Sequence, residues 1–165
     1  MFEDGIAKPL EGDNLRNALD FAAWLRANKF TPSWASWNCY KVNINGKCVC
    51  GIHLGCGEVI PDMWLTNYWH LGLGHRLFNH DNTSLSDREK EIVWSNLKIC
   101  NGCGAGCWPG HPRTYFGKKF ERVCGAGVEF WNPGAEEMEV AKKLFLMKRE
   151  YDKNKKTVES QNKRA

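Results

Sequence analysis

Four cysteines in the last third of the chain constrain its fold more than any other feature. They are Cys100, Cys103, Cys107 and Cys124, within the segment ICNGCGAGCWPGHPRTYFGKKFERVC. Four thiolates can close a tetrahedral cage around Zn²⁺, and the intervening glycines permit the tight turns that such a cage needs. A cage of four cysteines has no open position for a substrate. The spacing therefore predicts a structural zinc ion, held by a knuckle over residues 99–124.

The same spacing leaves alternatives open. Most zinc knuckles pair two C-x₂-C turns, whereas here a loop divides the second pair, and His111 could replace one thiolate. Reduced thiols without a metal, an iron–sulfur cluster and a redox disulfide are the other interpretations. The sequence thus predicts zinc without fixing the identity of the metal.

Length and composition describe one globular domain. The chain has 165 residues, enough for a hydrophobic core, and 42% of them are hydrophobic. The N-terminus lacks the apolar run of a signal peptide, and no stretch reaches the length of a membrane span. We therefore expect a cytoplasmic protein without a membrane partner, in which the eight cysteines are metal ligands or buried thiols rather than disulfides.

The positive charge is concentrated at the C-terminal end. The net charge is +4, and residues 141–165 hold nine Lys or Arg against three Asp or Glu. Nucleic-acid-binding domains usually carry basic residues on the folded body, so nucleic acid is not the expected partner. We expect a single domain over residues 1–151, followed by a basic, disordered tail over residues 152–165.

The apolar spacing predicts an α+β fold, an antiparallel β-meander packed by helices with the knuckle near the C-terminus. A helical stripe covers residues 14–28, and the capping-box sequence SDRE at residues 86–89 starts a second helix. A last helix opens at Asn132-Pro133 and frays after Tyr151. Strands are expected in a hairpin over residues 36–54, at residues 63–70 and around residues 127–131.

The turn Asn45-Gly46 between two strand-like runs is a strong hairpin signal. With these two residues in a type I′ turn, Val42 faces Val49 across the hairpin. One face of the sheet then holds Cys39, Cys48, Cys50, Ile52 and Leu54. These cysteines, with Cys56 just beyond, are interpreted as small buried hydrophobes rather than as ligands of a second metal.

Aromatic residues on or beside the predicted sheet form a second candidate site. The chain holds eight Trp, a residue that packs in cores and also lines ligand pockets. A concave aromatic face could bind a flat or cationic small molecule by stacking and cation–π contacts. The ligand-binding candidates are Trp37, Tyr40, Trp64, Tyr68 and Trp69. Simple filling of the core by alternate residues is the other interpretation.

No catalytic residue is predicted. The five histidines lack the HExxH signature of a catalytic zinc site, and neither a phosphate-binding loop nor a G-x-S-x-G elbow is present. An enzyme is therefore not the expected class.

Two phrases of the sequence resemble small bacterial proteins of clostridial type. The run WNCYKVNINGKCVCGI, residues 37–52, is similar to a tryptophan–strand–turn–strand unit of uncharacterised α+β proteins. The pattern C-x-x-C-x-x-x-C-x-P-G…F-G-K-x-F-x-x-V-C…N-P, residues 100–133, resembles the C-terminal knuckle of related sequences. The resemblance implies the fold and the knuckle and brings no assigned activity.

Taken together, the patterns predict a domain that binds structural zinc and takes a small molecule in an aromatic pocket. A nucleic-acid or protein interaction module, using the knuckle and the basic tail, is one alternative. A thiol redox or metal-handling protein, using the hairpin cysteines, is another. Neither the ligand nor the oligomeric state can be read from the sequence.

Overall fold

A computed structural model describes residues 2–36, 38–55, 67–78, 85–102 and 110–162, with side chains as far as residue 156. The helices are α1 (Phe2–Ala7), α2 (Gly12–Ala27), α3 (Asp87–Ser95) and α4 (Ala135–Asn162), with a 3₁₀ turn η1 (His75–Leu77). The strands are β1 (Pro32–Ser36), β2 (Cys39–Ile44), β3 (Lys47–Leu54), β4 (Trp69–Leu73), β5 (Leu97–Ile99), β6 (His111–Tyr115) and β7 (Lys118–Trp131).

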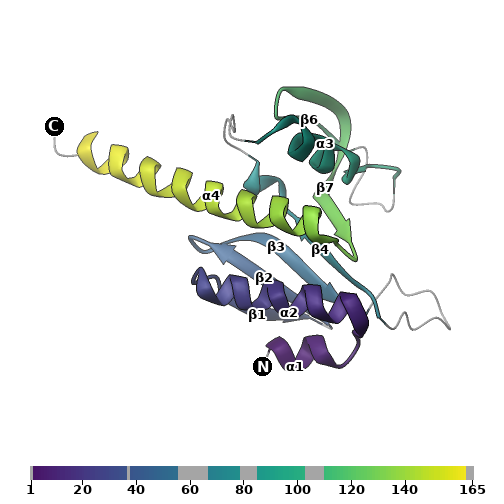
Figure 1. Ribbon diagram of the computed structural model, residues 1–165. Coiled ribbons are helices and arrows are strands. Elements are labelled where there is room, and N and C mark those ends of the chain that lie inside the picture. Colours follow the sequence, from purple (N-terminus) through teal and green to yellow (C-terminus); the bar gives the residue numbers. More distant parts are fainter. Residues whose placement is uncertain (1, 37, 56–66, 79–84, 103–109, 163–165) are drawn as a thin grey trace.

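The strands form one antiparallel sheet in the order β1-β2-β3-β4-β7-β5, and β6 pairs with β7 outside this path. The predicted α+β fold with an antiparallel β-meander is therefore confirmed. The long strand β7 joins two parts of the sheet. Its C-terminal half pairs with β4, and its N-terminal half continues outward to form a hairpin with β6 (Figure 1).

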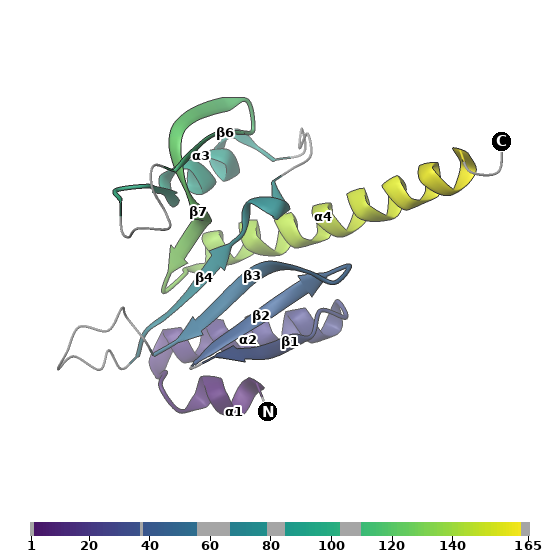
Figure 2. The same cartoon turned by 180° about the vertical axis from the view of Figure 1, so that it is seen from behind.

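The hydrophobic core lies between the sheet and the helices α2 and α4, which cover one face (Figure 1). Along each central strand the buried residues alternate with the side chains of the opposite face, as in a sheet with one covered face. Figure 2 shows that opposite face in front of α2. Among the described residues, no helix is both long and apolar enough to cross a membrane.

The hairpin of β2 and β3 has the predicted turn but not the predicted register. Asn45 and Gly46 both have positive φ, at 50° and 74°, as a type I′ turn requires. Val42, however, pairs with Cys50, because Val49 is an extra residue in β3 that forms a bulge. The prediction that Cys39 shares a face with Cys50 is therefore wrong. The extra residue shifts the register by one position for all pairs on the far side of Val49 from the turn, which moves Cys39 and Cys50 onto opposite faces.

Helix α3 begins as predicted. Ser86 is its N-cap, and the Ser86 and Glu89 side chains each accept a hydrogen bond from the other's backbone N–H, which completes the capping box. The Glu89 carboxylate also accepts hydrogen bonds from Lys143 Nζ at 2.9 and 3.0 Å. These bonds lower the pKa of Glu89 and tie α3 to α4.

Two elements, β4 and α4, extend past their predicted C-terminal ends. β4 covers Trp69–Leu73, three residues past the end of the strand predicted at residues 63–70, and residues 63–66 of that strand lie outside the described residues. α4 continues to Asn162 instead of fraying after Tyr151. Asp152 accepts a hydrogen bond from Asn45 at 3.0 Å, and Lys156 donates one to Asn45 at 2.8 Å. These contacts hold part of the predicted tail against the turn between β2 and β3.

The edge strand β1 is short and irregular. It opens on Pro32, which has no N–H to donate, and its register shifts at a bulge between Trp34 and Ser36. The other edge of the main path, β5, has three residues. Both edges therefore present little regular backbone.

Candidate functional site

The helix-free face of the sheet carries a row of side chains that comes from four strands. Cys39 on β2 pairs with His53 on β3, His53 pairs with His70 on β4, and His70 pairs with Trp131 on β7. Directly paired residues share a face, so all four side chains project from the side opposite the helices. Tyr68, just before β4, joins the row beside His70 and Trp131. We call these five residues the ring row.

The rings in this row stack on one another. The His53 and His70 rings are nearly parallel, with centroids 4.3 Å apart and an interplanar angle of 7°. The Trp131 ring stacks on the other side of His70 at 4.5 Å, and the Tyr68 ring lies 5.1 Å from Trp131. At the far end, Cys39 Sγ lies 3.7 Å from His53 Nε2. Trp131 is 47% exposed, so the stack presents an aromatic surface to solvent.

A strip without side chains runs beside the ring row. In the next cross-strand row, Lys41 pairs with Gly51, Gly51 with Gly72, and Gly72 with Glu129. A Cβ on Gly51 would lie 3.0 Å from His53 Nε2, so glycine at this position leaves room for the imidazole. Gly51 and Gly72, which we call the glycine strip, therefore expose backbone between Lys41 and Glu129, next to the stacked rings.

Burial keeps the ring row uncharged at neutral pH. Burial, with the charges of His53 and Lys98, lowers the pKa of His70 to about 4. Burial also lowers the pKa of His53, against the charge of Glu129, which raises it. Burial and the charge of Glu129 raise the pKa of Tyr68 to about 12. The row therefore offers neutral imidazoles and a phenol that remains a donor.

Two polar atoms of the row lack a hydrogen-bond partner in the described part of the chain. They are Tyr68 Oη and His70 Nδ1, and both are buried from solvent. Glu129, in contrast, is ion-paired with Lys98 at 3.0 Å. Buried polar groups in native proteins are nearly always paired with protein, ordered water or ligand. The row thus combines stacking surface with two unused hydrogen-bonding positions.

Lowering the pH from 6.5 toward 4 is expected to destabilise the fold through His70. In this range the unfolded chain binds a proton that folded His70, with its pKa of about 4, does not bind. A folded pKa below the unfolded value gives a contribution that is complete above pH 6.5 and is lost as the pH falls toward 4. With a discount for the partly exposed ring, the loss is on the order of 2 kcal/mol.

Urea unfolding at pH 7 and pH 4.5 measures this effect. His70→Gln should reduce the difference between the two midpoints, because it removes the imidazole whose pKa is lowered to about 4. The remaining difference in His70→Gln includes His53, whose pKa is also lowered by burial. If the midpoints of His70→Gln at pH 7 and pH 4.5 differ as much as those of the wild type, His70 is not the source of the pH dependence.

The aromatic residues chosen from the sequence are divided between the two faces. Tyr40 packs edge-on against Phe2 at 4.7 Å on the helix side, and Trp69 is 1% exposed in the core. Tyr68 belongs to the ring row on the opposite side. Trp37 and Trp64 lie outside the described residues. Neighbours in sequence along a strand point in opposite directions, so Tyr68 and Trp69 cannot line one site.

The described half of the predicted zinc knuckle lies where β5, β6 and β7 meet. Cys100 and Cys124 are buried, and Cys103 and Cys107 lie outside the described residues. The Cys100 N–H donates to the Arg122 carbonyl, two residues before Cys124, at 2.8 Å. A Cβ on Gly110, which has φ of +75°, would lie 2.7 Å from Cys100 Cβ. The chain therefore leaves Cys100 and returns to it at Gly110.

The alternative ligand for the knuckle is His111. His111 is exposed on β6 and pairs with Val123, directly before Cys124. Among the described residues, no group of three or more His, Cys, Asp or Glu side chains could hold a metal ion.

Burial works against activation of two hairpin thiols, those of Cys39 and Cys50. Cys39, Cys48 and Cys50 are free cysteines. Burial is the main cause that raises the pKa of Cys39, and it raises that of Cys50 well above the usual value. A nucleophilic or redox-active cysteine needs a lowered pKa, so these two thiols lack the electrostatic environment of a thiol enzyme. Cys56 lies outside the described residues.

The basic residues near the C-terminus are partly used within the fold. A cavity of about 390 Å³ between the β2–β3 turn and α4 is lined by Lys47, Arg76, Lys148, Lys155 and Lys156, together with Asp152. Lys148 is ion-paired with Asp152, and Lys156 donates to Asn45. The Lys148 pair lies within α4, whereas Lys156 ties α4 to the hairpin, so both lysines have structural contacts independent of any nucleic acid.

The sequence did not reveal the ring row. His53, His70 and Trp131 are far apart in the chain, and only the registers of two strand pairs, β3–β4 and β4–β7, bring them together. One available signal was the alternation of His53 with Ile52 and Leu54, since a polar residue between apolar ones belongs to the opposite face.

The chain matches no family model, no curated protein and no solved structure.

Proposed function

We propose that this protein is a zinc-stabilised binding domain that takes a planar, uncharged small molecule on the helix-free face of its sheet. The observation that carries this proposal is a pair of polar atoms, Tyr68 Oη and His70 Nδ1, that have no partner among the described residues and lie within a stack of aromatic rings. A flat ligand could lie over the glycine strip and stack against the ring row. Both atoms are closed to solvent, so binding would turn the Tyr68 and His70 side chains until the two atoms pair with the ligand's polar edge.

The chemistry of the face favours a neutral ligand. Both histidines of the row have lowered pKa values, the Tyr68 phenol stays protonated, and Glu129 is paired with Lys98. The described side chains of the row therefore add no net charge at pH 7. Stacking together with one or two hydrogen bonds is the usual way in which such surfaces hold a heteroaromatic ring.

Zinc has a structural part in the proposal, with Cys100, Cys103, Cys107 and Cys124 as its ligands. Support comes from the two buried cysteines at the β5–β7 junction and from the return of the chain to Cys100 at Gly110. Cys103 follows Cys100 by three positions, and Cys107 precedes Gly110 by three. Thiolate ligands suit Zn²⁺, which would fasten this segment to the end of the sheet.

Binding of adenine, nicotinamide and indole, measured by calorimetric titration, tests the ligand site. We expect adenine or nicotinamide to bind in preference to indole, whose edge carries a single donor. Trp131→Ala should abolish binding, because it removes the exposed end of the stack. Tyr68→Phe should weaken binding about threefold to tenfold, the effect of one neutral hydrogen bond.

A matched control separates the site from general aromatic adhesion. Trp34 is 66% exposed and pairs with Tyr40, which places it on the opposite face from the ring row. Trp34→Ala should therefore bind the probes like the wild type. Equal binding by all three variants, or no binding of any probe, would refute the proposed face.

A further inference from the structure

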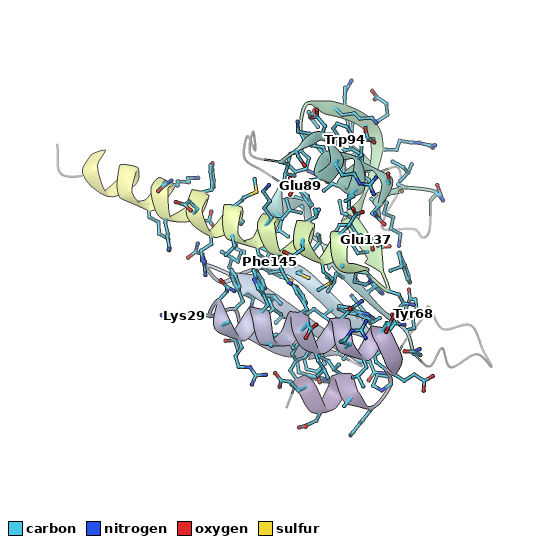
Figure 3. All side chains as sticks on the ribbon, viewed as in Figure 1. Lys29, Tyr68, Glu89, Trp94, Glu137 and Phe145 are labelled. Carbon is cyan, nitrogen blue, oxygen red and sulfur yellow. The ribbon has the colours of Figure 1, made fainter. Side chains whose placement is uncertain are left out.

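A second, separate cavity lies between η1 and β6, away from the ring row. It has a volume of about 260 Å³ and is lined by His75, Phe78, Pro112, Arg113, Thr114 and Tyr115. The Tyr115 ring packs edge-on against Phe78 at 4.9 Å, and the Tyr115 carbonyl accepts a hydrogen bond from Trp94 Nε1 at 2.9 Å. Figure 3 labels Trp94 in this part of the molecule. The wall of the cavity is thus fixed by packing.

Three polar side chains of this cavity have atoms without a hydrogen-bond partner in the described part of the chain. The atoms are His75 Nδ1, Arg113 Nε and Tyr115 Oη, and all are buried. Tyr115 is 2% exposed, so water at the surface cannot serve its hydroxyl. A single unpaired buried atom is uncommon, and three of them among the residues that line one cavity favour a ligand or an ordered water as their partner there.

The charges of the lining residues select the kind of ligand. Burial lowers the pKa of His75, and the charges of Arg113 and Arg76 lower it further, against a backbone hydrogen bond with Gly125. Burial raises the pKa of Tyr115, and the charge of Arg113 opposes that shift. The charge of the Arg113 guanidinium therefore works to lower the pKa of both His75 and Tyr115. The described lining holds this cation and no carboxylate, so its potential favours an anion.

We propose that this cavity binds the oxyanion group of a small ligand, with Arg113 Nε and Tyr115 Oη donating hydrogen bonds to its oxygens. Guanidinium and phenol groups are donors at neutral pH, and arginine matches the geometry of carboxylate and phosphate. His75 Nδ1 accepts a hydrogen bond from a hydroxyl or amine next to the oxyanion. The volume is just below the roughly 300–1,000 Å³ of drug-sized pockets, which suits a compact metabolite.

Calorimetric titration of the full chain in Tris-chloride with inorganic phosphate, succinate and malate tests this proposal. We expect saturable binding of at least one of these anions beyond the effect of sodium chloride at equal ionic strength. Phosphate and the carboxylates distinguish the two possible oxyanions. Malate differs from succinate by one hydroxyl, so tighter binding of malate would support the role of His75 Nδ1.

Two substitutions and a control identify the groups responsible. Arg113→Gln should weaken binding by about tenfold or more, since it removes a charge-assisted hydrogen bond. Arg122→Gln makes the same change at an exposed position on the neighbouring strand β7 and should leave affinity within about twofold. Tyr115→Phe keeps the ring and removes a hydroxyl without a partner, so it should weaken binding while leaving the melting temperature unchanged or higher.

The last variant keeps the test decisive if Arg113→Gln does not fold. An unchanged affinity in Tyr115→Phe, or a lower melting temperature without loss of binding, would show that the hydroxyl serves the fold. Equal effects of Arg113→Gln and Arg122→Gln, or no anion binding beyond that of chloride, would overturn the proposal. None of these substitutions touches the ring row, so the outcome is independent of the ligand site on the sheet.

Discussion

Removal of the proposed zinc is expected to lower the melting temperature by roughly 10 °C or more. A ligand at a thousand times its dissociation constant stabilises the folded state by about 4 kcal/mol, and structural zinc commonly reaches that regime. In a domain of this size, each kcal/mol lost from the free energy of unfolding lowers the melting temperature by about 2–4 °C. The reason is local, because the ion would hold residues 100–124 against the β5–β7 junction, where Cys100 and Cys124 are buried.

Metal analysis and thermal unfolding, with and without a chelator, measure this effect. Reduced protein purified without chelators should contain about one zinc per chain, as a single four-ligand site holds one ion. Cys124→Ala should lose the zinc and become insensitive to the chelator. Cys50→Ala provides the control, because Cys50 is equally buried but lies on β3 outside the knuckle, and this variant should keep the zinc. Zinc-free wild-type protein, or full zinc content in Cys124→Ala, would refute the knuckle.

Phe145→Ala is expected to lower the free energy of unfolding by about 3–5 kcal/mol. Phe145 is fully buried on α4, and its ring packs edge-on against the rings of Phe30 at 5.3 Å and of Phe21 and Trp24 at 6.1 Å. Figure 3 shows Phe145 between α4 and α2. Truncation would leave a cavity where the two helices meet the sheet, and the surrounding rings cannot collapse into it without losing their own contacts.

Leu146→Ala is the matched control for this cavity. Leu146 is the next residue on the same helix and is 36% exposed, so its truncation removes apolar surface without opening a comparable void. Its effect should remain below about 2 kcal/mol. Urea unfolding followed by circular dichroism at pH 7 compares the two variants. Equal unfolding midpoints would mean that the interface between α2 and α4 is not the centre of the core.

Local signals in the sequence predicted much of the fold. The capping box at Ser86, the Asn45-Gly46 turn and the apolar stripe of α2 depend only on residues within a few positions of each other. Each of these elements is present in the structure. The fold class followed from their order along the chain.

The errors and omissions concern features that depend on distant residues. The bulge at Val49 forms where the Val49 carbonyl accepts a hydrogen bond from Gly74 at 2.9 Å, and the hairpin sequence by itself does not contain that partner. The ring row requires the registers of β3, β4 and β7 together. Likewise, the cavity beside Arg113 joins residues of η1 and β6 that lie more than thirty positions apart. Tertiary packing sets all three features.

The irregular edge of the sheet has a consequence for self-association. A straight outer strand offers a row of unsatisfied amides on which another polypeptide can grow into a fibril. Here the first outer strand starts with a residue that has no amide hydrogen and is kinked after Trp34, and β5 on the far side is only three residues long. Neither of these two borders can template a long ladder, so we expect both to resist growth into cross-β aggregates even though the central strands are rich in apolar residues.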